Sequence, residues 1–190
     1  MNPDSSQYLA INTGFPNAYD RANSRTGAFL MIHGGCSSAG CYAMTDEQIA
    51  EIYALAREAF FGGQKSFQLQ AYPFRMTPLN IASHRDSPHM PFWKMIKQGY
   101  DHFEVTHHEP KINVCEKSYV FDAETADSFN PTGRCPFYRV REDVALAVRE
   151  KQRRDDAEMV ALVNRGTPTV PVTTGGYGGM NATFLSAEAQ

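Results

Sequence analysis

Two side chains that could serve as a nucleophile and its base, His33 and Cys41, share one short stretch of the sequence. A cysteine attacks a carbonyl group as its thiolate, and a neighbouring histidine is the usual acceptor of the thiol proton. The glycines Gly34, Gly35 and Gly40 permit tight turns and a close approach of a ligand to the backbone. The pattern predicts acyl transfer at Cys41, with His33 as the base.

Two other interpretations of the same residues stay open. An isolated cysteine and histidine are more often a buried thiol and an ordinary imidazole than a catalytic pair. Alternatively, His33, Cys36 and Cys41 could bind zinc, which takes nitrogen and sulfur ligands in a tetrahedral site. That site would need a fourth ligand, and the chain contains no Cys-x-x-Cys pair.

The flanks of this stretch predict the elements that position it. An apolar run over residues 28–32 predicts a buried strand that carries His33 at its end. Thr45 and Gln48 have the spacing of a capping box, and a periodic apolar stripe follows them. We therefore expect a helix over residues 46–60 that packs its apolar face on the sheet.

A turn just ahead of that helix is the expected place of Cys41. Backbone N–H groups at Gly40 and Cys41 would then be free to hold a developing oxyanion. Ser38 could orient His33, or it could simply shape the turn, as serine often does in such loops.

Further elements are predicted from alternation, apolar periodicity and turn residues. The middle of the last predicted helix is crowded with charges, which favours a solvated helix that is docked only by its ends. We expect strands over residues 7–13 and 65–71, a surface loop over 18–27, a hairpin of 112–115 with 118–121, helices over 78–84, from Pro91 to Gly99 and over 139–164, and a flexible tail over 166–190.

Composition narrows the class of protein. The chain has 190 residues, 42% of them hydrophobic, which is enough for a globular domain with a core. Its net charge of −3 gives no basic footprint for nucleic acid. No stretch is apolar and long enough to span a membrane, and the first residues lack the pattern of a signal peptide.

Four cysteines are too few to indicate a disulfide scaffold. A bridge between Cys36 and Cys41 would block the expected nucleophile, so we treat it as a redox liability. Cys115 and Cys135 could pair in an oxidising compartment if their geometry allows it.

Several motifs together resemble the L,D-transpeptidase catalytic domain of the YkuD type, and in particular its YafK-like branch. The resemblance runs from about residue 3 to about residue 122, with the motifs in the family's order. Ala39 and Ala43 depart from the wider family, which usually has His and Arg there, but are normal for this branch. The matching motifs are Gly14–Ala22 (GFPNAYDRA), Ile32–Gly34 (IHG), Ser38–Met44 (SAGCYAM), Tyr72–Met76 (YPFRM) and Gly99–Glu104 (GYDHFE).

This resemblance implies a fold and a domain organisation. The fold would be mixed α/β and mainly β, a YkuD-like β-sandwich or sheet with packed helices. Residues 1–122 would form the catalytic domain, with its N-terminal part missing because the family has several strands before the first motif. Residues 123–190 would form a C-terminal extension with a charged helix and a flexible tail.

The resemblance also implies a reaction on peptidoglycan stem peptides at meso-diaminopimelate. Cys41 would form a thioester, with His33 as base, Gly40 and Ser38 at the oxyanion turn, and Tyr42, Arg75 and Asp20 near the substrate. Arg75 could bind a substrate carboxylate through two hydrogen bonds. No metal or cofactor is expected.

Two alternatives remain within the same substrate class. The chain could be an amidase that releases a peptidoglycan-linked lipoprotein with water as acceptor, or an inactive peptidoglycan-binding module. In each case the resemblance implies a place in the periplasm or cell envelope, with no nucleic-acid partner and no membrane span.

Overall fold

The computed structural model describes residues 1–171. Its contacts divide this part of the chain into two units, with the boundary between Leu69 and Gln70. Each unit is described by itself. Most of the tail that was predicted to be flexible, residues 172–190, lies outside the described residues.

Unit 1 is built on a four-stranded sheet with the order β1-β2-β3-β4. The first three strands pair antiparallel, and β4 joins β3 in parallel. β2 confirms the strand that alternation predicted, whereas β1 and β4 are too short to show a periodic pattern. The strands are β1 (Asn2–Ser5), β2 (Tyr8–Asn12), β3 (Met31–His33) and β4 (Tyr42–Ala43).

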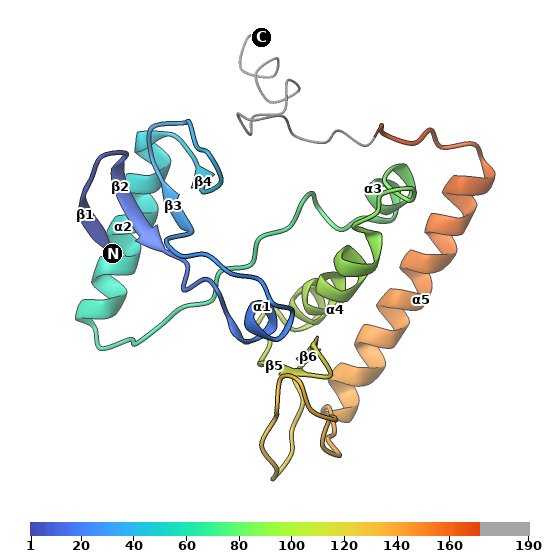
Figure 1. Ribbon diagram of the computed structural model, residues 1–190. Coiled ribbons are helices and arrows are strands. Elements are labelled where there is room, and N and C mark those ends of the chain that lie inside the picture. Colours follow the sequence, from blue (N-terminus) through green and yellow to red (C-terminus); the bar gives the residue numbers. More distant parts are fainter. Residues whose placement is uncertain (172–190) are drawn as a thin grey trace. The chain divides into compact units, whose positions relative to one another are not determined.

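Helix α2 (Asp46–Phe61) confirms the helix that was predicted after the glycine-rich stretch. Thr45 and Gln48 form the expected capping box, which satisfies two backbone donors at the start of the helix. The buried side chains Ile49 and Ala56 pack with Ile11 of β2 and Ile32 of β3. Figure 1 shows α2 lying against these strands.

The predicted loop over residues 18–27 is wrong in its first half, because helix α1 spans Ala18–Ala22. Asn17 caps it and accepts the Asp20 N–H at 3.0 Å, while the Asp20 carboxylate accepts the Asn17 N–H at 3.0 Å. This capping box is a sequence signal in its own right, and the polar composition of the segment concealed it.

Unit 2 consists of three helices and one hairpin. The hairpin and α3 have nearly the predicted bounds, and α5 begins three residues later than predicted. The elements are α3 (Pro78–Ser83), α4 (Met90–Thr106), β5 (Ile112–Cys115), β6 (Ser118–Phe121) and α5 (Glu142–Asn164).

Gly99 does not end a helix as expected, because α4 continues through it to Thr106. A β-carbon on Gly99 would lie 2.5 Å from Cε1 of Phe121, so glycine here lets the helix pack closely on β6. The helix ends instead at His107, whose φ of 54° is left-handed.

Apolar side chains from α3, α4 and α5 form one cluster with the segment before α3. Met76, Ile81 and Met90 are its buried centre, and Trp93 packs against it. α5 contributes Met159 to the same cluster. Figure 1 shows α4 and α5 running side by side.

The charged middle of α5 corrects the expectation of a solvated face. Lys151 and Asp155 of α5 meet Lys97 and Asp101 of α4 in what we call the α4–α5 charge cluster. Asp101 is only 1% exposed. The charges can be buried because each has opposite partners, and the helix is therefore docked by its middle as well as by its apolar side chains.

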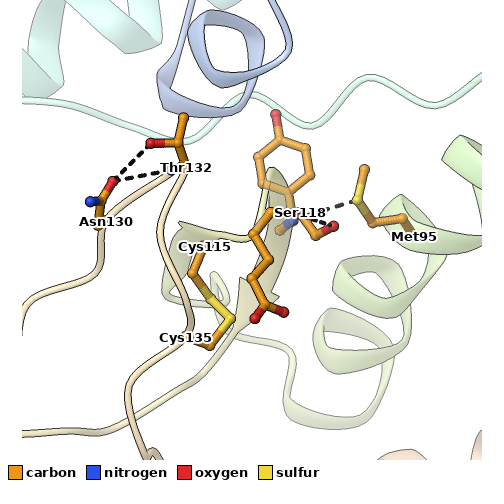
Figure 2. Close-up of a disulfide and its surroundings, with 8 residues drawn as sticks. Met95, Cys115, Ser118, Asn130, Thr132 and Cys135 are labelled. Carbon is orange, nitrogen blue, oxygen red and sulfur yellow. Dashed lines mark hydrogen bonds between the residues drawn. A yellow bond between two sulfur atoms is a disulfide. The ribbon is translucent and has the colours of Figure 1, made fainter.

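A disulfide joins Cys115 at the end of β5 to Cys135, across 20 residues of chain. Figure 2 shows this bridge beside the turn in which Asn130 accepts the Thr132 N–H at 3.1 Å. The Glu116 N–H also donates to the Gly133 carbonyl at 2.8 Å. The pairing that the sequence left open is therefore formed, and it fastens the loop to the hairpin.

Two expectations about the fold need correction. The alternating segment over residues 65–71 is not a strand, and it belongs to neither sheet of the described structure. The mixed α/β class is confirmed, but helices hold more of residues 1–171 than strands do, so the chain is not mainly β there. The two sheets lie in different units, and the sandwich stays a prediction.

The catalytic domain predicted over residues 1–122 and the extension over 123–190 also stay predictions. The boundary between the two compact units lies between Leu69 and Gln70 and not at residue 122, because α5 packs on α3 and α4. In the part of the chain that the structure describes, no helix is long and apolar enough to cross a bilayer.

Candidate functional site

The parallel pairing of β3 with β4 brings the segment that contains Cys41 beside the strand that ends in His33. Ile32 pairs with Tyr42 and His33 with Ala43. Cys41 directly precedes β4, so it lies two positions from the residue opposite His33. Cys41 was expected on a turn just ahead of a helix; the structure places it in a bend, with the short strand β4 between it and α2.

Two backbone groups of the segment leading into β3 hold the Cys41 sulfur. The Met31 N–H donates to Cys41 Sγ at 3.4 Å, and the thiol lies 3.5 Å from the Phe29 carbonyl, to which it can donate. Together the N–H and the carbonyl fix the position of the Cys41 sulfur beside β3.

His33 is buried, with 5% of its surface exposed, and its ring is fixed by one backbone contact. Its Nδ1 lies 2.6 Å from the Gly34 carbonyl oxygen. A carbonyl only accepts, so Nδ1 carries the proton and Nε2 of the neutral ring is left as the base. Within the described residues His33 and Cys41 do not hydrogen-bond each other.

A hydrogen bond to the first residue of α2 fixes the turn after His33. The Gly35 N–H donates to the Asp46 carboxylate at 2.8 Å, and the Met44 N–H donates to the His33 carbonyl at 2.9 Å. A β-carbon on Gly34 would lie 2.4 Å from Asp46 Oδ1. The capped start of α2 therefore fixes the backbone on the C-terminal side of the proposed base.

Ser38 acts as a turn former in this structure. Its hydroxyl accepts the Gly40 N–H at 3.0 Å. The Gly40 N–H is therefore already bonded, and it would have to leave Ser38 in order to bind an oxyanion. The oxyanion role of Gly40 stays a prediction that needs this exchange.

The three residues expected near the substrate are found in different settings. Tyr42 is 45% exposed and adjoins Cys41. Asp20 is 7% exposed and is engaged by the cap of α1 and by Arg25 Nη1 at 3.4 Å, which gives it a structural role. Arg75 is exposed and belongs to unit 2, and its role at the substrate stays a prediction.

The zinc alternative finds no geometric support. It needs His33, Cys36 and Cys41 to converge, and residues 1–171 contain no group of three or more His, Cys, Asp or Glu side chains that could hold a metal ion. Cys36 is instead exposed, with its thiol 3.3 Å from the Met44 carbonyl. Cys36 and Cys41 are both free thiols, so the disulfide between them that would block the nucleophile is not formed.

Reasoning from the sequence missed three contributors to the site. Met31 and Phe29 act through backbone groups, which no sequence pattern reveals. Asp46 was expected only as the first residue of the helix over residues 46–60, which gave no reason to place its carboxylate on Gly35. Adjacent glycines before an acidic helix start could have suggested the contact.

Comparison with known proteins agrees with the motifs. Over 120 residues this chain is 50% identical to the protein named "Putative L,D-transpeptidase YafK" from Escherichia coli K12. The protein of the same name from Escherichia coli O157:H7 gives the same identity over the same length. The matched stretch is 63% of this chain and 49% of each relative, so the chain spans about half the length of the curated relatives it matches.

No protein-family model matches the chain. The similarity to YafK at this level of identity nevertheless confirms the resemblance to YafK-like L,D-transpeptidases that the motifs indicated.

Proposed function

We propose that this chain carries a cysteine-dependent L,D-transpeptidase site that acts on peptidoglycan stem peptides at meso-diaminopimelate. The observation that carries the proposal is the pairing of β3 with β4, which sets Cys41 beside a strand that ends in His33. The similarity to a protein that bears the L,D-transpeptidase name supports the reaction class.

In the first half-reaction the Cys41 thiol gives its proton to His33 Nε2, and the sulfur attacks the diaminopimelate carbonyl carbon. A carbon–sulfur bond forms and the carbon–nitrogen bond to D-alanine breaks. His33 returns the proton to the departing amine. The Met31 N–H holds the sulfur in place before the attack, and catalytic contacts that are long in a free enzyme often shorten with substrate.

In the second half-reaction an amine attacks the thioester. A new amide bond forms, the carbon–sulfur bond breaks, and the Cys41 sulfur recovers a proton by way of His33. Backbone donors near Gly40 would stabilise the negative oxygen in both steps. A single such donor contributes about 3 kcal/mol to the reduction of the barrier.

Hydrolysis is the second candidate, and the exposure of the site is compatible with it. Tyr42 next to the nucleophile is 45% exposed, and the space around Gly40 is open. Water can therefore reach a thioester on Cys41 as readily as an amine can. In the hydrolytic reaction the product is a free diaminopimelate carboxylate, and the leaving group could be a peptidoglycan-linked lipoprotein.

The disulfide between Cys115 and Cys135 supports a place in the cell envelope. Structural disulfides persist in oxidising compartments such as the bacterial periplasm and are rare in the cytosol. The pairing leaves Cys36 and Cys41 as the free thiols of the chain. We propose a periplasmic location on this basis and on the similarity to YafK.

The experiment incubates the chain with a tetrapeptide stem that ends in D-alanine and follows the products by mass spectrometry. Release of D-alanine with a cross-linked peptide dimer supports transpeptidation, and release with a tripeptide supports hydrolysis. Cys41→Ala should abolish both, and Cys36→Ala, which removes the other free thiol, should change neither. A folded chain that binds the tetrapeptide but releases no D-alanine would overturn the enzymatic proposal in favour of a binding module.

A further inference from the structure

The peptide group between Gly34 and Gly35 makes a polar contact at each of its two ends. Its carbonyl oxygen, which belongs to Gly34, lies 2.6 Å from Nδ1 of His33. Its N–H, which belongs to Gly35, donates to the Asp46 carboxylate at 2.8 Å. In a trans peptide such as this one the C=O and the N–H point in opposite directions. One planar unit therefore connects the imidazole to the carboxylate.

The orientation of this peptide group depends on the groups that bind it. Two consecutive glycines leave the peptide between them free to rotate, and Gly35 has a left-handed φ of 77°. The sheet holds the turn on either side of the peptide. The Gly34 N–H donates to the Leu9 carbonyl of β2 at 3.2 Å, and the Cys36 N–H donates to the Met44 carbonyl at 3.2 Å. The Gly35 N–H is held by α2 instead, through Asp46.

Asp46 is placed to hold the peptide group firmly, because it is the first residue of a capped helix. The capping box of Thr45 and Gln48 fixes the backbone from which its side chain projects. A hydrogen bond with a charged partner is stronger than one between neutral groups. The contact is also close packed, since a β-carbon on Gly34 would lie 2.4 Å from Asp46 Oδ1.

The far end of the peptide group decides which nitrogen of His33 carries the proton. A neutral imidazole has two tautomers, and the hydrogen bond made at one nitrogen selects between them. The Gly34 carbonyl selects the tautomer with the proton on Nδ1, which leaves Nε2 as the base. His33 is only 5% exposed, so water cannot easily replace this carbonyl. Hydrogen bonds in a chain polarise one another, so the carboxylate on the N–H also makes the carbonyl a better acceptor.

We propose that Asp46 is a positioning residue for His33 and acts through the Gly34–Gly35 peptide group. Asp46 holds the N–H of this group, so that the carbonyl at the other end faces Nδ1 and keeps the proton there. Nε2 then stays available for the proton of Cys41. The inference rests on the proposed function only through the role of His33 as the base, and all of its contacts lie within unit 1.

The test compares alanine variants at two adjacent positions of α2. Asp46→Ala removes the acceptor of the Gly35 N–H. Glu47→Ala is the matched control, because Glu47 is the other acidic residue in the first turn and its loss removes the same charge from the helix start. Asp46→Asn is the conservative variant, since its amide oxygen can still accept the Gly35 N–H. Thermal unfolding of each variant is recorded as the check on folding.

The first readout is the tautomer of the neutral His33 ring, measured by nitrogen NMR on a chain with isotope-labelled histidine. The chain has six histidines, and His33→Gln identifies the signals of this one. We expect the native chain, Glu47→Ala and Asp46→Asn to carry the proton on Nδ1. In Asp46→Ala the ratio of the Nδ1–H to the Nε2–H form should fall about tenfold, as when one hydrogen bond to a charged group is lost. A native ratio in a folded Asp46→Ala chain would overturn the positioning role.

The second readout is the rate at which a carbapenem acylates Cys41, followed by intact mass. Asp46→Ala should be acylated about tenfold more slowly, because the ring loses its fixed orientation as well as its tautomer. Asp46→Asn should recover most of the rate, and Glu47→Ala should match the native chain. Equal slowing in Asp46→Ala and Glu47→Ala would overturn the inference, because it would assign the effect to the charge of the helix start.

The tautomer is measured without turnover, so this inference and the proposed function can fail separately. A native chain that forms no adduct would count against Cys41 as the nucleophile, and the tautomer would still test the role of Asp46. A native chain whose His33 carries its proton on Nε2 would overturn the inference, whatever the rate of acylation.

Discussion

Gly34 lies so close to Asp46 that a β-carbon at position 34 would sit 2.4 Å from the Asp46 carboxylate oxygen. The same β-carbon would also meet the Gln7 carbonyl and Ile49 at 3.1 Å. The residue after the proposed base is thus enclosed by the turn between β1 and β2 on one side and by the start of α2 on the other.

Gly34→Ala should therefore destabilise unit 1 by about 1–3 kcal/mol, as overpacking in a dense site does. Thermal unfolding is the measurement. Gly62→Ala is the matched control, because its nearest neighbours are at 3.4 Å and its φ of −70° suits alanine. A Gly34→Ala chain as stable as the control would show that Asp46 does not enclose the turn.

His33→Gln should slow acylation of Cys41 by about 10²–10⁴-fold, the usual contribution of a positioned general base. The substitution removes the basic Nε2 from a buried position at the end of β3. The acylation rate is measured by mass spectrometry at several pH values, with circular dichroism as the check on folding. An unchanged rate would remove His33 from the mechanism.

Local signals in the sequence predicted the elements that they encode directly. The Thr45 capping box and the apolar stripe behind it predicted α2 almost to the residue. The helix predicted from residue 78 does begin at Pro78, where the Thr77 hydroxyl accepts the Asn80 N–H at 3.3 Å. In each case the determinants lie within one turn of helix, so no distant partner is needed.

Features that depend on a distant partner were missed. Residues 65–71 alternate like a strand, but alternation supplies no neighbouring strand; Phe67 does pack toward the core of unit 1, while Leu69 is 43% exposed. The charges of α5 were read as solvated because Lys97 and Asp101 lie far away in the sequence. The sequence revealed the pair His33 and Cys41. It could not reveal the hydrogen bond from the Met31 N–H to the Cys41 sulfur.

Loss of the disulfide should weaken unit 2. Cys115→Ser with Cys135→Ser opens a loop whose ends are 20 residues apart, and a bridge over a loop of about this length contributes about 3 kcal/mol. The unfolding free energy is compared with that of Cys36→Ser, which removes an exposed free thiol. Equal stability of the two variants would mean that the bridge does not constrain the fold.

Alkaline pH should reveal the buried setting of Tyr72, whose pKa is raised to about 12 by burial and by Asp101. A raised pKa means that the fold favours the neutral phenol, so this stability is present below about pH 10 and is lost as pH rises toward 12. Tyrosinate absorbance is the measurement. Tyr72→Phe should leave the titration up to about pH 11 unchanged; a lost step near pH 10 would contradict this setting.

The central claim is that Cys41 is the nucleophile, and intact mass after incubation with a carbapenem tests it most directly. A carbapenem is a strained cyclic amide, so it reports thiol acylation without any need for an acceptor. The chain should gain one adduct, Cys36→Ala should gain the same adduct, and Cys41→Ala should gain none while keeping its fold. An adduct that persists in Cys41→Ala and is lost in Cys36→Ala would place the nucleophile at Cys36 and contradict the account.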